Sequence, residues 1–371
     1  MAGSAPILSA ADHALVQASR RLAPLLRVLG SLEEELREKE LAAIELHRPV
    51  FVAGLARSGT TMMLELLSQA DGVATHRYRD FPFLLAPLAW SWLQDRLAPG
   101  AGQPVERPHR DRIAITRESA EAFEEPLWQA FFPGAHDPAQ CHVLGPQASH
   151  PVFEAFFAAH LRKILWLRGG SRYVSKGNYN VARIGYLARV FPDARFVVPV
   201  REPLSHVHSL VRQHRLFCRY AAQDPRVPRY LEAAGHYEFG PQRRPVNLEP
   251  ARIGEIDAAW RAGEEHRGYA RQWAQVYAHV HRLRRDPALA GRILVVRYED
   301  ACASPQAAVR ALLEFCALGD SQGRVGAAAA RLAAAPAQPL EARAADAVWA
   351  EAGAAGALYG YFRETRAGSA A

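Results

Sequence analysis

Apolar positions in the first part of the chain recur at the spacing of an α-helix. Between residues 10 and 46, leucines repeat every three or four positions around a charged run, EEELREKE. This pattern predicts one or two opening helices that serve packing or dimerisation. The apolar segment Val50–Ala53 then meets a glycine-containing turn, and helical spacing resumes from Met62 to Leu67. We expect a strand, a loop and a helix in that order.

The later part of the chain alternates in the same way. Apolar runs predict strands near Tyr173 and over residues 195–200 and 292–297. Helical spacing and first-turn prolines predict helices over residues 182–190, 203–218, 257–284 and 305–316. Segments rich in proline and glycine predict loops at 98–112 and 133–151, around a helical insertion at 114–132. Residues 220–255 show no readable pattern, and the alanine-rich residues 319–347 form either helix or linker.

Strands that alternate with helices favour an α/β fold. We expect a P-loop-like, mostly parallel sheet flanked by helices, with helical insertions and an N-terminal helical extension. Residues 1–46 are predicted to form the extension, and residues 47–365 a single α/β domain. In such a sheet, ligands bind at the carboxyl ends of the strands.

Charge and cysteine content narrow the classes of function. The 371 residues carry a formal charge of +7, but the basic side chains are scattered, which suggests anionic ligands rather than nucleic acid. The four cysteines lack the spacing of a disulfide framework or a zinc site. No metal site is predicted among the histidines of the 203–218 helix either, because neighbours two apart face different ways: His206, His208 and His214.

The N-terminal residues and the lysine usage add two further expectations. The start of the chain has no secretory signal pattern and no segment is apolar enough to span a bilayer, so we expect a cytoplasmic protein. Lysine occurs only at Lys39, Lys163 and Lys176, while arginine supplies the other cations. Each lysine in such a chain is a candidate for a specific role, because an ammonium and a guanidinium group bind their partners differently.

The turn after the first strand reads GLARSGTT, from Gly54 to Thr61. It has the glycine spacing and terminal threonine of a P-loop, but Thr60 stands where a nucleotide-binding lysine belongs. Backbone N–H groups, threonine hydroxyls and the helix N-terminus can hold a phosphate here, and Arg57 can supply the missing cation. A terminal phosphosulfate fits this loop better than a triphosphate that is to be hydrolysed.

GLARSGTT closely resembles the 5′-phosphosulfate-binding loop of sulfotransferases, in particular the bacterial and Golgi-type groups with RSGTT or RTGTT. The resemblance implies 3′-phosphoadenosine-5′-phosphosulfate as the donor, bound by these loop residues: Arg57, Ser58, Gly59, Thr60 and Thr61. It also implies a second motif, a strand that ends in arginine with a serine eight residues later. Arg201 and Ser209 match that motif and would hold the 3′-phosphate.

Sulfuryl transfer needs positive charge on the leaving oxygen and a base for the acceptor proton. Arg57 and Lys176 suit the first task. Lys176 resembles the lysine of the KxH segment in cytosolic members, but Asn178 replaces the histidine. This points to the groups that use a carboxylate, and Asp80 lies near the position of that acid. We therefore predict Asp80 as the base, with these residues as rivals: His76, Glu124 and Glu125.

Two other functions remain open at this point. One is a P-loop kinase or other nucleotide phosphotransferase, and the other is a nucleotide-binding protein without activity. The acceptor could be a saccharide, a lipid or a small metabolite, because fold does not settle substrate.

Overall fold

The computed structural model describes residues 9–97, 100, 102–106, 109, 114–330, 332 and 340–363. Five strands form one parallel sheet in the order β2-β5-β1-β6-β7. Three strands make its centre: β5 (Arg172–Gly177), β1 (Val50–Ala53) and β6 (Arg195–Val200). The edges are β2 (Val73–Ala74) and β7 (Ile293–Arg297). The predicted parallel sheet is confirmed.

The strand β1 is the centre of both the sheet and the core. Its four residues are fully buried, as expected for a strand that is covered on both faces. Val50 and Val52 pack into a cluster with one set of helices, and Phe51 and Ala53 into a second, larger cluster. The alternation of side chains along a strand therefore divides the core into two layers.

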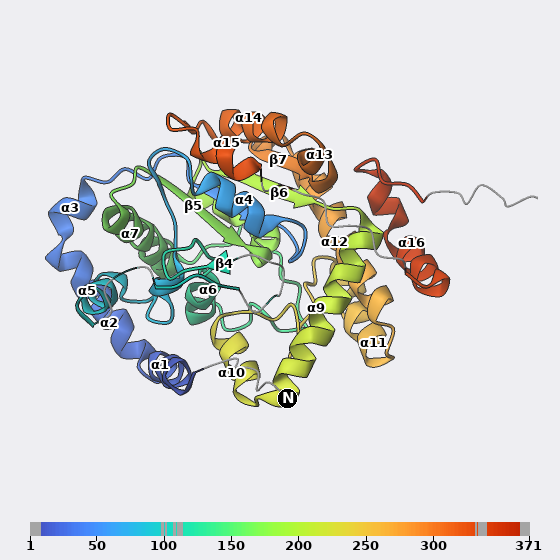
Figure 1. The fold of residues 1–371 in the computed structure, drawn as a ribbon, viewed down its shortest axis with the longest axis horizontal. Coiled ribbons are helices and arrows are strands. Elements are labelled where there is room, and N and C mark those ends of the chain that lie inside the picture. Colours follow the sequence, from blue (N-terminus) through green and yellow to red (C-terminus); the bar gives the residue numbers. More distant parts are fainter. Residues whose placement is uncertain are drawn as a thin grey trace, which may run out of the picture.

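Helices cover both faces of the sheet (Figure 1). One face is covered by α4 (Thr60–Leu67), α14 (Pro305–Cys316) and α15 (Arg324–Ala329). The other is covered mainly by α7 (Pro151–Arg168), α8 (Ile184–Val190), α12 (Glu265–Arg284) and α16 (Ala342–Ala357).

The other described elements surround this core. The helices are α1 (Ala10–Arg21), α2 (Ala23–Leu36), α3 (Glu38–Ala42), α5 (Pro87–Leu97), α6 (Glu125–Phe131), α9 (Pro203–Gln223), α10 (Arg226–Ala233), α11 (Glu255–Arg261) and α13 (Tyr298–Ala303). The 3₁₀ turns are η1 (Tyr78–Asp80), η2 (Asn178–Ala182), η3 (Pro250–Arg252) and η4 (Pro287–Leu289). A separate antiparallel pair joins β3 (Val105–Glu106) to β4 (Ala114–Ile115).

Several predicted boundaries were wrong. The helix expected over 257–284 is two helices, because Gly263 adopts a left-handed backbone with φ of 76° between α11 and α12. The helical insertion expected over 114–132 is helical only in α6. The helix α7 was not predicted. The stretch 319–347 contains α15 and the start of α16, while residues 331 and 333–339 lie outside the described part, as does much of the loop predicted at 98–112.

The opening helices are tied to the sheet domain by a buried lysine. Lys163 on α7 is 1% exposed and its Nζ donates a hydrogen bond of 2.6 Å to the carbonyl of Gly30 on α2. The same ammonium lies 3.4 Å from the buried carboxylate of Glu33. Because a buried charge needs its partner, α2 is held in one position on the domain. Among the described helices, none combines the length and hydropathy that a bilayer-spanning segment requires.

Candidate active site

The sheet order places several chain turns at one edge. From β1 the chain reaches β5 on one side of β1 and then β6 on the other, so the connections diverge at the carboxyl end of β1. Such a switch point forms a crevice for ligands. Val52 on β1 pairs in register with Lys176 on β5, and β6 ends one residue before Arg201. Lys176, Arg201 and the turn after β1 therefore share this edge.

The turn from Gly54 to Thr61 joins β1 to α4, and its conformation includes positive φ angles at Gly59 and Arg57. Gly59 has φ of 107° and stands immediately before the first helical residue, Thr60. A Cβ at Gly59 would lie 3.0 Å from the ring of Tyr298, a tight contact, and L side chains rarely adopt this φ, so the position favours glycine. Arg57 also has a positive φ, 71°. Ser58 closes the turn, since its hydroxyl donates a hydrogen bond of 2.8 Å to the Leu55 carbonyl.

The first turns of α9 lie against this loop. The guanidinium Nε of Arg57 donates a hydrogen bond of 3.3 Å to the hydroxyl of Ser209. The guanidinium of Arg201 lies 5.1 Å from the ring centre of Tyr298, the same ring that contacts Gly59. Arg201 and Ser209 thus stand on the same edge of the sheet as Thr60, which a nucleotide gripped at both ends would require.

A buried histidine fixes α9 to the loop. His206 Nε2 donates a hydrogen bond of 2.8 Å to the carbonyl of Ala56, and its Nδ1 accepts one of 3.1 Å from the indole of Trp273. This pattern requires the neutral imidazole. Burial lowers the pKa of His206 to about 3, which is consistent with that form. His206 is therefore a positioning residue, not a metal ligand, and no described cluster of histidine, cysteine and acidic side chains suits a metal ion.

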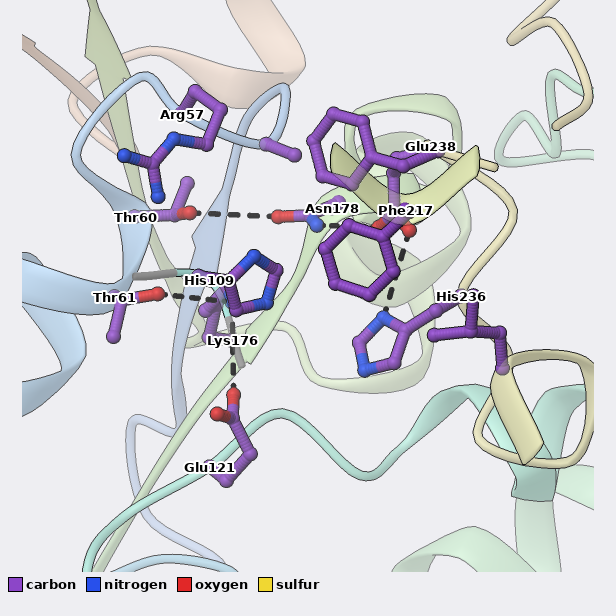
Figure 2. A pocket seen from close by; sticks show the side chains of 13 residues that line it. Arg57, Thr60, Thr61, His109, Glu121, Lys176, Asn178, Phe217, His236 and Glu238 are labelled. Carbon is purple, nitrogen blue, oxygen red and sulfur yellow. Dashed lines mark hydrogen bonds and ion pairs between the residues drawn. The ribbon is translucent and has the colours of Figure 1, made fainter. Parts of the chain in front are cut away.

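Lys176 links the loop to a carboxylate. Its Nζ donates a hydrogen bond of 3.2 Å to the hydroxyl of Thr61, and it lies 3.7 Å from a carboxylate oxygen of Glu121. Glu121 also accepts a hydrogen bond of 2.5 Å from the phenol of Tyr78. The side chains of Lys176 and Glu121 are both almost buried. A cation and a carboxylate therefore stand side by side next to the loop (Figure 2).

A second polar chain approaches Thr60 from the other side. The hydroxyl of Thr60 donates a hydrogen bond of 3.4 Å to Asn178 Oδ1, and Asn178 Nδ2 donates one of 2.5 Å to Glu238. The other carboxylate oxygen of Glu238 lies 3.5 Å from Nδ1 of His236. Figure 2 shows this series from the loop to His236.

The charges of His236 and Glu238 stabilise each other. Burial works against both charged forms, but the hydrogen bond and charge of His236 outweigh it and lower the pKa of Glu238 to about 2. In the same way, burial is outweighed by the hydrogen bond and charge of Glu238, and the pKa of His236 is raised. Below the raised pKa of His236, the pair is therefore an imidazolium beside a carboxylate.

One pocket is lined by side chains of the loop and of the two polar chains, namely Arg57, Thr60, Thr61, Lys176, Glu121, Asn178, Glu238 and His236 (Figure 2). Arg201 and Ser209 are not among its lining residues. Beside the loop residues and the two polar chains, its wall includes the apolar side chains of Phe217, Leu231 and Phe239 and the ring of His109. The two phenylalanine rings stack 5.8 Å apart. The pocket thus has a cationic, hydroxyl-rich side at the loop and an apolar side opposite it.

The sequence matches one protein family. Residues 49–240 match the sulfotransferase family, a span that is just over half of the chain. The chain belongs to the sulfotransferase family. The comparison with curated proteins found no match.

Three solved sulfotransferases resemble the structure. STF9 from Mycobacterium avium has a TM-score of 0.52 and 16% identity, over 96% of this chain and 86% of that one. STF1 from Mycobacterium tuberculosis H37Rv has 0.45 and 15%, over 90% and 81%. A sulfotransferase from Alicyclobacillus acidocaldarius has 0.43 and 13%, over 85% and 94%. The first of these shows that the chain shares the sulfotransferase fold.

In this sulfotransferase, Asp80 lies outside the pocket. Its carboxylate accepts a hydrogen bond of 2.5 Å from the buried guanidinium of Arg168 and one of 2.8 Å from the backbone N–H of Arg77. It is 5% exposed and is not among the residues that line the pocket. Each of its two carboxylate oxygens therefore has a donor that is not part of the pocket. This environment does not favour Asp80 as the base.

The three rivals also lie outside the pocket lining. His76 is fully buried, 2.8 Å from His160, and burial lowers its pKa to about 4. Glu124 accepts a hydrogen bond of 2.7 Å from Tyr173. Burial works against the charge of Glu125, but ion pairs with Arg183 and His136 lower its pKa to about 2. Glu121, three residues before Glu124, was missed, because no local pattern distinguishes it.

The His236–Glu238 pair makes a prediction for stability against pH. The pKa of Glu238 is lowered from 4.5, so its contribution is complete above about pH 4.5 and is lost as the pH falls toward 2. The pKa of His236 is raised from 6.5, so its contribution is complete below about pH 6.5 and is lost as the pH rises through the raised value. Glu238→Gln should therefore destabilise the protein most between about pH 4.5 and 6.5, by about 1–3 kcal/mol.

Denaturant unfolding at a series of pH values measures this difference. Glu249→Gln, which changes a half-exposed carboxylate 3.9 Å from Arg252, is the matched control and should show no such maximum. A Glu238→Gln difference that does not change between pH 3 and pH 9 would contradict the pairing.

Proposed function

We propose that this sulfotransferase moves a sulfuryl group from 3′-phosphoadenosine-5′-phosphosulfate to a hydroxyl or amine of its acceptor. The observation that carries the proposal is the hydrogen bond between Arg57 and Ser209. It joins the phosphosulfate loop to the helix that bears the second anion-binding motif. One nucleotide with phosphates at both ends of its ribose suits two cationic sites that lie this close.

In this proposal, the two ends of the donor have separate binding groups. The loop from Gly54 to Thr61 binds the 5′-phosphosulfate with its backbone N–H groups, Ser58, Gly59 and the hydroxyls of Thr60 and Thr61. The loop faces the N-terminal end of α4, whose dipole favours an anion. Arg201 and Ser209 bind the 3′-phosphate. The absence of a loop lysine, and the match to the sulfotransferase family, do not favour the kinase alternative.

The transfer forms one bond to sulfur and breaks another. The acceptor oxygen or nitrogen bonds to sulfur while the bond from sulfur to the bridging oxygen breaks and adenosine 3′,5′-bisphosphate leaves. Arg57 and Lys176 stabilise the negative charge that grows on that bridging oxygen. Lys176 is suited to this because it already donates a hydrogen bond to Thr61 of the loop.

We assign the acceptor proton to Glu121. Its carboxylate lines the pocket and lies 3.7 Å from the ammonium of Lys176. A donor phosphosulfate attracts the ammonium of Lys176, which leaves Glu121 better able to accept a proton. Glu238 is instead held in its charged form by His236.

Nucleotide binding tests the donor. Adenosine 3′,5′-bisphosphate should raise the melting temperature by several degrees, whereas ATP with magnesium should not, because a ligand stabilises only the state that it binds. Ser209→Ala should reduce the shift, since it removes a 3′-phosphate contact. Ser205→Ala, one turn earlier on α9, is the matched control and should keep it. A shift with ATP and none with the bisphosphate would favour the kinase alternative.

Turnover tests the base. With sulfur-labelled donor and the best acceptor from a panel of saccharides, lipids and small alcohols, Glu121→Gln should lower kcat about 10²–10⁴-fold. Asp80→Asn should lower the free energy of unfolding by up to about 3–5 kcal/mol, because it leaves Arg168 buried and unpaired, yet keep kcat within a few fold below its melting temperature. The opposite result, with Asp80→Asn folded but inactive and Glu121→Gln unchanged, would restore Asp80 as the base.

A further inference from the structure

The helix α2 presents a row of apolar side chains to solvent. Leu25 is 61% exposed, Val28 58%, Leu32 45% and Leu36 80%. Their spacing of three, four and four residues places them on one face of the helix. Figure 1 shows α2 at the outer edge of the molecule. A contiguous apolar row of this kind on a folded protein marks a surface that binds a partner.

A different face of α2 packs on the domain. Leu26, Gly30 and Glu33 are its buried residues. Lys163 holds this face through the Gly30 carbonyl and the Glu33 carboxylate. The apolar row is therefore separate from the face of α2 that packs on the domain. Because α2 is tied to the core, the row points in a fixed direction.

The row has the spacing of a helix-packing seam. Leu25, Val28, Leu32 and Leu36 recur every three or four residues, while Leu29 is half-buried and packs against the domain core. Two helices with such seams pack their side chains into one another, and a surface of this kind is complementary to itself. This favours a second copy of the same chain as the partner.

The charges along α2 favour an antiparallel pair. Arg21, the last residue of α1, and Arg27 lie at the N-terminal end, while residues 33–40 at and beyond the C-terminal end carry five glutamates against Arg37 and Lys39 and remain net acidic. In an antiparallel pair, the basic end of each helix lies beside the acidic end of the other, and the helix dipoles also oppose favourably. The same carboxylates are unfavourable beside an anionic lipid surface.

We propose that α2 forms a homodimer interface, in which two copies pack antiparallel about a two-fold axis. Val28 then lies opposite Leu32 of the partner subunit, and Leu25 opposite Leu36 of the partner subunit. The inference is independent of the proposed activity. A single 14-residue helix covers less than the roughly 800 Å² that each partner buries in a standard interface, so the dimer is a reversible one in the micromolar range.

Sedimentation velocity between about 1 and 100 µM tests the interface. The wild-type chain should shift with concentration toward twice its mass of 40.9 kDa. Leu32→Glu should raise the dimer dissociation constant about 100-fold or more, because it places two charges in the seam, and should leave the melting temperature unchanged in dilute solution. Leu358→Glu, which replaces a leucine 44% exposed at the end of α16, is the control and should dimerise like the wild type. A wild-type monomer at 100 µM, or an unaltered Leu32→Glu dimer, would overturn the proposal.

Disulfide cross-linking tests the orientation. On oxidation, a mixture of the Val28→Cys and Leu32→Cys variants should form cross-links between the two different variants, above the background of the wild-type chain. Cross-links of Leu32→Cys with itself alone would instead show a parallel pair. If the chain stays monomeric but floats with phosphatidylserine vesicles, and Leu32→Glu abolishes this, the row binds lipid and the dimer proposal fails.

Discussion

The parallel pairing of β1 with β5 on one side and β6 on the other is the constraint on which the candidate site depends. It brings the carboxyl ends of three strands to one edge of the sheet. There the glycine turn follows β1, Lys176 and Asn178 lie at the end of β5, and Arg201 follows β6. The pairing is stabilised by complete burial of β1, since both faces of that strand pack into core clusters. A shift in its register by one residue would turn its side chains to the opposite faces and separate these groups.

The site is also an electrostatic arrangement in which cations and carboxylates neutralise each other in pairs. Lys176 lies beside Glu121, and His236 beside Glu238. Within each pair, the attraction between the two charges offsets part of the desolvation penalty of burial. An arriving anion would compete with Glu121 for Lys176, so binding of a donor and activation of a base are coupled through one ammonium group.

Local sequence patterns predicted those strands, turns and helices whose own residues determine their conformation. The apolar run Val50–Ala53 followed by glycines predicted the strand, turn and helix, and Arg195–Val200 was predicted with its observed bounds. Spacing along the chain did not predict which acidic side chains lie in the pocket, because contacts between distant segments determine this. Asp80 lies at a plausible distance from the loop in sequence, but Arg168, from a helix that was not predicted, holds its carboxylate outside the pocket. Glu121, His236 and Glu238 come from segments without periodicity, and only the folded chain brings them beside Lys176 and Asn178.

The central claim is that the loop and the start of α9 grip two ends of one nucleotide. Titration calorimetry with adenosine 3′,5′-bisphosphate and with adenosine 5′-monophosphate, on the wild type and on Arg201→Met, measures this most directly. The account predicts that the wild type binds the bisphosphate at least about tenfold more tightly, and that Arg201→Met removes this preference but still binds the monophosphate. Equal affinity of the wild type for both nucleotides would contradict it.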